Sequence, residues 1–306
     1  FSIFLLAQSP AFGQNQTNNS KPETDAAQLN VLIKKIGERV KENLDSMFSV
    51  AFSESIRMQE LKADLSAKGK QKHFLYESVL TNRPASAKVA NYQPTFIRTL
   101  KSINGKPVKE QISAEQSKCE ETNPQPTYED PLAFLLPKNQ SNYIFSHGGQ
   151  ENLDGRESIV VFVSEKQVSE PLAVVEKDDC LFLSRPLQIK GKIWVDSKTY
   201  DVIQTQWEQA ENFSTVLPKK TVKKGIIPLV RPAVTLSYDK QDFTIRFRRV
   251  KFENPDQTLL LPYSSESVWI TKGMNLEGMR TEIEYTRYRT FKTNVEVNDL
   301  DKAPNP

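Results

Sequence analysis

The stretch GKIWVDSKTYDVIQTQW, residues 191–207, decides the fold of this chain because it alternates between apolar and polar residues, turns, and alternates again. In the first half Ile193 and Val195 share one face, and Trp194 lies on the other. The polar segment DSKTYD follows, and the second half then places Ile203 and Trp207 on one face. Alternation on both sides of a polar turn predicts an antiparallel β-hairpin.

The same period of two extends in both directions from this hairpin. The segments FSVAFSESIRM (residues 48–58) and HFLYESVLT (73–81) alternate in the same way. Asn104-Gly105 suits the type I′ turn of a further hairpin within TFIRTLKSINGKPVKEQI. In FTIRFRRVKF (243–252) the alternation slips by one residue at Arg248-Arg249, which predicts a β-bulge.

One amphipathic helix precedes the strands. Its apolar residues recur at spacings of three and four, and they are Leu29, Ile33, Ile36, Val40 and Leu44. Asp25 and Gln28 form a capping box at its start. A short second helix is expected from Asp130 to Pro137, inside an otherwise irregular segment at 112–140.

Strands follow one another with little helix between them, which excludes a βαβ architecture. We therefore predict a mainly β (α+β) protein: a curved antiparallel half-barrel of about ten or eleven strands, covered by the N-terminal amphipathic helix and the short second helix. Residues 1–13 are expected to be a truncated signal peptide and residues 14–24 a disordered linker. Residues 25–298 would form a single β domain, and residues 299–306 a disordered tail.

Several features point to an exported protein. FSIFLLA at the start reads as the end of a signal-peptide apolar region and is far shorter than the roughly 20 residues that span a bilayer. Cys119 and Cys180 are then expected to form a disulfide, the alternative being two free buried thiols. The location predicted is periplasmic or secreted. Because 41 basic residues are balanced by 38 acidic ones, no nucleic-acid partner is expected.

Catalytic apparatus is not visible in the sequence. The metal donors His73, Cys119, His147 and Cys180 are far apart and form neither a CxxC nor an HExxH spacing. No GxSxG elbow is present. We expect no catalytic residues, no metal, no cofactor and no enzyme activity. A hydrolase is the third alternative, and it would need His73 or His147 buried beside a carboxylate.

An apolar concave face is the most promising functional feature. A curved sheet with one helix to cover it presents inward apolar residues that either line an open cavity or form a closed core, and the sequence leaves both possibilities open. The candidates are Phe52, Ile56, Phe74, Tyr76, Phe96, Ile193, Val195 and Phe247. A basic segment, PKKTVKK (218–224), either meets an anionic lipid or acidic partner or is a solvated loop.

The order of these elements resembles a known family. An amphipathic helix leading into SVAFSESIRM, a series of hairpins, GKIWVDSKTYDVIQTQW and a closing strand EIEYTRYRTF are similar to the bacterial lipoprotein-carrier (Lol-type outer-membrane lipoprotein-sorting) superfamily. The resemblance implies an incomplete curved barrel with a helical lid, and non-catalytic binding of an acyl chain or lipidated protein in its cavity. The segments at 112–140 and 209–232 depart from the carrier pattern.

The partners expected are a hydrophobic or acylated ligand, an envelope protein, and a membrane touched only peripherally. Outer-membrane lipoprotein sorting is the form of the function that the resemblance implies. The alternative is a structural or protein-interaction module of the cell envelope.

Overall fold

The computed structural model describes residues 22–47, 49–62, 64–81, 95–108, 130–166, 174–177, 180–183, 189–217, 220–224, 227–231, 233–272 and 278–291. The predicted signal peptide, the tail and Cys119 lie outside the described residues, as does most of the predicted linker. Only the backbone of Cys180 is described. The signal peptide and the disulfide therefore stay predictions.

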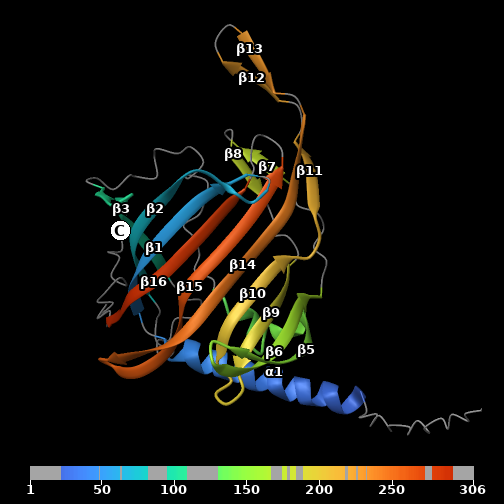
Figure 1. Cartoon of the computed structure of the whole chain (residues 1–306), viewed down its shortest axis with the longest axis vertical. Helices are drawn as coiled ribbons and strands as arrows, with labels where there is room; N and C mark the ends of the chain where they lie inside the picture. Colours follow the sequence, from blue (N-terminus) through green and yellow to red (C-terminus); the bar gives the residue numbers. More distant parts are fainter. Residues whose placement is uncertain are drawn as a thin grey trace, which may run out of the picture.

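A curved antiparallel sheet dominates the described part of the chain (Figure 1). It has 12 strands in the order β4-β3-β2-β1-β16-β15-β14-β10-β9-β6-β5, and β11 pairs with β14 beside β10. The two ends of this order, β4 and β5, do not pair with each other, so the sheet stays open. The predicted mainly β half-barrel is confirmed. The short strands β4 and β11 bring the number of strands in this sheet to 12.

The strands of the large sheet are β1 (Ser49–Leu61), β2 (Ala67–Thr81), β3 (Thr95–Ile103), β4 (Lys106–Pro107), β5 (Tyr143–Leu153), β6 (Arg156–Glu165), β9 (Ile189–Asp196), β10 (Val202–Gln209), β11 (Phe213–Leu217), β14 (Val234–Glu253), β15 (Asp256–Lys272) and β16 (Met279–Phe291). Two further hairpins form separate two-stranded sheets: β7 (Val174–Lys177) with β8 (Cys180–Leu183), and β12 (Lys220–Lys224) with β13 (Ile227–Arg231).

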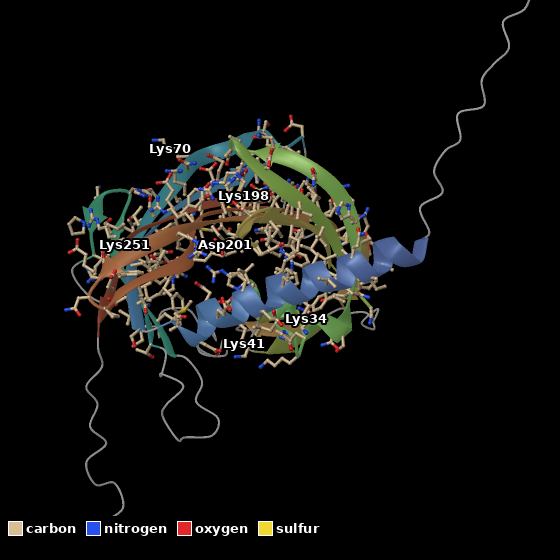
Figure 2. All side chains as sticks on the ribbon, turned by 90° about the horizontal axis from the view of Figure 1, so that it is seen from below. Lys34, Lys41, Lys70, Lys198, Asp201 and Lys251 are labelled. Carbon is tan, nitrogen blue, oxygen red and sulfur yellow. The ribbon has the colours of Figure 1, made fainter. Side chains whose placement is uncertain are left out.

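The long helix α1 (Pro22–Asp45) lies across one end of the concave side of the sheet (Figure 2). It begins at Pro22, before the predicted capping box, and proline suits the first position of a helix because its missing N–H has no partner there. Ile33, Ile36 and Val40 are buried toward the sheet, as the periodicity predicted. The helix therefore acts as a partial cover.

The predicted short helix is a 3-10 turn, η2 (Ala133–Leu135), followed by a second turn, η3 (Gln140–Asn142). The Asp130 carboxylate accepts the Leu132 N–H at 2.7 Å, which satisfies an amide at the start of this turn. The turns pack closely against α1 at Gly37, where an added Cβ would lie 2.5 Å from the Leu135 carbonyl oxygen. A glycine inside the helix is explained by this close approach.

The hairpin of residues 191–207 forms as predicted, from β9 and β10. The Asp196 carboxylate accepts the amides of Lys198 and Thr199 at 2.9 Å each and so closes the polar turn. One prediction is wrong: the register shifts between Val202 and Gln204, so Val202 faces the helix. Ile203 instead packs with Trp194 on the opposite face.

The predicted type I′ turn and the predicted β-bulge have different outcomes. Asn104 and Gly105 have φ values of 49° and 77°, and positive φ at both central positions is the requirement of a type I′ turn. The bulge predicted at Arg248-Arg249 of β14 is wrong, because the ladder between β14 and β15 shifts between Arg246 and Phe247, and the extra residue there is Tyr263 on β15. Local alternation along β14 cannot locate a bulge that lies in the neighbouring strand.

Gly191 provides room for the indole of Trp207. A Cβ at residue 191 would lie 2.5 Å from Cε3 of Trp207 and 2.8 Å from the Gln206 carbonyl oxygen. We expect Gly191→Ala to lower the free energy of unfolding by about 1–3 kcal/mol in urea denaturation, because overpacking displaces the indole. In a Trp207→Leu background the same change should cost less. An equal cost in both backgrounds would show that the indole is not the cause.

Candidate functional site

One row of cross-strand neighbours runs over the concave side of the sheet, which we call the inner face because α1 covers part of it. Each member pairs with the next across adjacent strands, from β3 to β5. The row consists of Ile103, Phe74, Ile56, Ile283, Ser265, Ile245, Thr205, Ile193, Val161 and His147. Directly opposed residues in a sheet share a face, so these side chains form a continuous and mostly apolar band.

Burial changes sharply along this row. Thr205, Ile193 and Val161 are 0% exposed, because they lie in the core beneath α1. Toward β3, Ile245 is half-buried at the margin of this core, and Ile283, Phe74 and Ile103 are half-buried as well, whereas Ile56 is 7% exposed. The helix therefore closes one end of the inner face and leaves the other end partly open to a further apolar group. We call this other end, with Phe74, Ile103, Ile245 and Ile283, the uncovered row.

An aromatic cluster closes the inner face beside β1. Phe52 is 8% exposed, and its ring lies 6.3 Å from that of Phe96, 5.9 Å from Tyr285 and 5.3 Å from Tyr288. Burial raises the pKa of both tyrosine hydroxyls, so both stay neutral at physiological pH. Phe52 is therefore part of a closed core.

A buried polar group interrupts the apolar inner face between Phe52 and the uncovered row. Glu54 is 3% exposed, and its carboxylate accepts hydrogen bonds from Ser78 and, at 2.7 Å, from Arg98. Arg98 also lies over the ring of Tyr76, 4.3 Å from its centroid. Pairing makes the burial of this charge tolerable. Glu54 is not among the predicted site residues, although it occupies an inward position of the alternation between Phe52 and Ile56.

An open cavity of about 450 Å³ lies between the first half of α1 and strands β5 and β6. Its lining mixes apolar and polar side chains: Gln28, Leu29, Val31, Leu32, Lys35, His147, Gln150, Ile159 and Tyr200. Val31, which lies in this lining, is 56% exposed. The cavity suits an amphipathic molecule better than bare hydrocarbon.

Asp201 ties the helix to the sheet. Its carboxylate accepts hydrogen bonds from Arg249 on β14, at 2.5 and 2.8 Å, and from Arg39 on α1 at 3.2 Å. Arg39 also donates to Glu42 at 2.7 Å. Figure 2 shows Asp201 beside the helix. The paired charges balance one another, so the arrangement fastens the cover.

Removing this link gives a second prediction. Asp201→Ala should lower the free energy of unfolding by about 1–2 kcal/mol, a value reduced for screening because Arg39 and Arg249 are 38% and 37% exposed. Asp45→Ala removes an exposed ion pair with Lys41 on the same helix and should cost less than about 0.5 kcal/mol. Urea denaturation of both variants tests this, and equal losses would contradict it.

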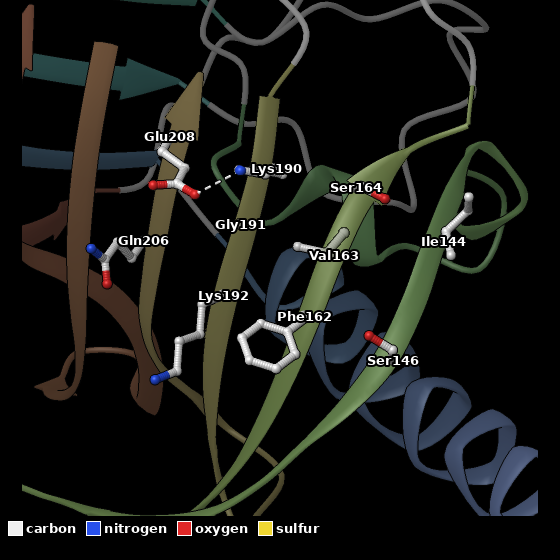
Figure 3. A pocket seen from close by; sticks show the side chains of 10 residues that line it. All are labelled: Ile144, Ser146, Phe162, Val163, Ser164, Lys190, Gly191, Lys192, Gln206 and Glu208. Atoms are coloured by element: carbon white, nitrogen blue, oxygen red, sulfur yellow. Dashed lines mark ion pairs between the residues drawn. The ribbon is translucent and has the colours of Figure 1, made fainter. Parts of the chain in front are cut away.

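The convex outer face carries a shallow hollow of about 480 Å³ over β5, β6, β9 and β10 (Figure 3). Phe162 and Ile144 are 46% and 54% exposed there. A salt bridge of 3.2 Å between Lys190 and Glu208 lies at its side. Strand β5 is the last strand of the sheet order in the described part of the chain, so exposed apolar side chains lie here beside an edge of the sheet.

The histidines do not form the arrangement that a hydrolase needs. His73 is exposed and lies 2.9 Å from the hydroxyl of Ser55, and His147 is exposed with its Nδ1 accepting the Gly149 N–H at 3.0 Å. Neither is buried beside a carboxylate in the described part of the chain. Within the same residues, no cluster of His, Cys, Asp and Glu is suited to a metal ion. No described helix is long and apolar enough to cross a membrane.

The eight cavity candidates all lie on the inner face but in different surroundings. Ile193, Val195 and Phe247 are 0%, 0% and 3% exposed in the core beneath α1. Ile56 is 7% exposed in the row, while Phe74 is half-buried. Phe96 and Tyr76 are half-buried as well, and Phe52 is enclosed by aromatic rings. Only the half-buried members are available to contact a ligand.

Ile245, Ile283 and Ile103 join the uncovered row although the sequence analysis did not select them. The alternation of their own strands could have identified these three residues as inward-facing. In the structure each lies opposite an inward residue of the next strand.

No family model and no curated protein matches the sequence. A DUF1329 family protein from Desulfovibrio piger is similar in structure, with 11% identity, a TM-score of 0.36, and coverage of 88% of this chain and 95% of that one.

Two further solved structures are similar to this chain at the same level. A LolA superfamily protein from Nitrosomonas europaea has 11% identity, a TM-score of 0.33, and coverage of 85% and 94%. A putative outer membrane lipoprotein-sorting protein domain from Vibrio parahaemolyticus has 12% identity, a TM-score of 0.33, and coverage of 88% and 95%.

Proposed function

We propose that this chain is a non-catalytic binding protein of the bacterial envelope that holds a hydrophobic ligand, an acyl chain or a lipidated protein, on the inner face of its half-barrel. The observation that carries the proposal is the change in burial along one row. The row passes from full burial at Ile193 to half-burial at Ile245 and Ile283, without leaving the inner face. Sorting of lipoproteins to the outer membrane is the form of this function that the sequence resemblance implies.

The uncovered row has the right chemistry for hydrocarbon. A bound acyl chain would replace the water that still contacts its isoleucines and Phe74. The binding free energy gained is about 25 cal/mol for each Å² of apolar surface removed from water. The neighbouring Tyr285 is neutral, and the Glu54 charge is paired. The uncovered row itself contains no charged residue, so a hydrocarbon chain bound on it would leave none of its members as an unpaired buried charge.

Native mass spectrometry tests whether such a ligand exists. The protein should be purified from the envelope of its own host without detergent, and its lipid extract analysed beside the intact mass. An added mass matching an extracted acyl species supports the proposal and identifies the ligand class. A clean apo mass, with no uptake of a fluorescent fatty acid, would contradict it.

The outer hollow favours a second candidate function, a protein-interaction module. Exposed Phe162 and Ile144 beside the edge strand β5 would suit a partner that adds a strand to the sheet. Phe162→Asp separates the two functions, because it would abolish binding of such a partner and leave the uncovered row intact. Retention of partner binding by this variant would exclude the outer hollow as the interface.

A further inference from the structure

The hairpin of β12 and β13 stands apart from the body of the protein. It connects β11 to β14, which pair from Phe213 with Tyr238 to Leu217 with Val234. Its two strands form their own sheet and pair with no other described strand. Figure 1 shows the hairpin beyond the ends of β11 and β14, away from the large sheet. An isolated two-stranded hairpin has marginal stability in water, so its sequence is not explained by a contribution to a core.

All charged residues of this segment are basic. KKTVKKGIIPLVR, residues 219–231, contains five basic residues and no acidic residue, whereas the whole chain has a net charge of +3. The remainder of the chain is therefore net negative. An anionic surface would attract the hairpin and repel the rest of the protein, which would fix the orientation of approach.

In the pairing register of this hairpin, basic and aliphatic residues lie close together. Lys220 lies opposite Arg231 and Val222 opposite Leu229, so these residues share one face. Lys223 is placed on the other face. Basic residues beside aliphatic ones are the composition of segments that dock on the headgroups of an anionic bilayer.

We propose that the β12–β13 hairpin docks the protein on an anionic lipid surface. A bilayer needs no fixed pattern of partner charges, which suits cations placed on both faces of a projecting hairpin. Nucleic acid fits less well, because residues 219–231 contain no aromatic residue on which bases would stack. This site is independent of ligand binding on the inner face.

Vesicle flotation of the full chain tests the proposal. The vesicles are phosphatidylcholine alone, or with about 30 mol% phosphatidylglycerol, in about 0.05 to 0.5 M NaCl. The first variant replaces Lys220, Lys223, Lys224 and Arg231 with Gln. The control variant removes the same charge from exposed lysines elsewhere, namely Lys34, Lys70, Lys198 and Lys251, which are labelled in Figure 2.

The wild type should bind the anionic vesicles and lose this binding as salt rises. The hairpin variant should bind at least about a hundredfold more weakly, since it lacks four cations that each contribute roughly fivefold, and the control variant should stay within about twofold of wild type. Equal losses in both variants, or wild-type binding that is the same on both vesicles, would overturn the proposal. Capture of an acidic protein without vesicle binding would also overturn it. Fatty-acid uptake by the hairpin variant should be unchanged.

Discussion

Trp207→Ala is expected to lower the free energy of unfolding by about 3–5 kcal/mol. Trp207 is 4% exposed beneath α1, with its ring 4.7 Å from Phe134 in an edge-on contact and 6.1 Å from Phe243. Removing the indole leaves a cavity where the helix, the turn η2 and the sheet meet. Urea denaturation followed by far-UV circular dichroism measures the loss.

Trp194→Ala is the matched control because it lies in the same hairpin on the opposite face. Trp194 is 5% exposed, but its cluster contains only Val160 and Ile203 as further buried residues. Its Nε1 donates to the Glu151 carboxylate at 2.7 Å. We expect a loss of about 1–2 kcal/mol, since few apolar contacts disappear. A loss at residue 194 as large as that at residue 207 would contradict the assignment of the main core to the inner face.

Phe74→Asp should weaken the binding of a fluorescent fatty acid by about tenfold or more, because a carboxylate in contact with hydrocarbon must lose its hydration. Phe74 lies on the inner face opposite Ile56 and is half-buried, so the folded state tolerates the change better than it would at Phe52. Phe74→Leu keeps an apolar surface of similar reach and should bind within about threefold of wild type. Fluorescence titration gives the three dissociation constants.

Phe162→Asp introduces the same charge on the outer face and should leave fatty-acid binding unchanged. Thermal melting of each variant confirms that it is folded. A folded Phe74→Asp variant that binds as well as wild type would remove the uncovered row from the site. A loss in Phe162→Asp alone would move the site to the outer hollow.

Sequence alternation predicted which residues of a strand share a face, because the side-chain period of a strand is two. It placed Ile193 with Val195, and Phe52 with Ile56, correctly. It failed at Val202 and Ile203, since a bulge adds one residue without leaving a mark in the hydrophobic pattern.

Local sequence patterns could not predict where the helix lies over the sheet. It depends on pairing between distant strands, such as β1 with β16 and β10 with β14. These pairings bring Ile283 beside Ile56 and Ile245 beside Thr205, and they decide which part of the row lies under α1. The sequence therefore predicted an apolar inner face but left undecided whether it was open or closed, and the structure divides it into a closed and a half-open part.

Photocrosslinking tests the central claim most directly. A fatty acid carrying a diazirine near its methyl end is bound, irradiated and located by peptide mapping. Binding on the inner face predicts labels at residues of the uncovered row, on β2, β3, β14 and β16, which unlabelled fatty acid prevents by competition. Labels confined to the outer hollow around Phe162 and Ile144, or no label that competes, would contradict a ligand site on the inner face of the half-barrel.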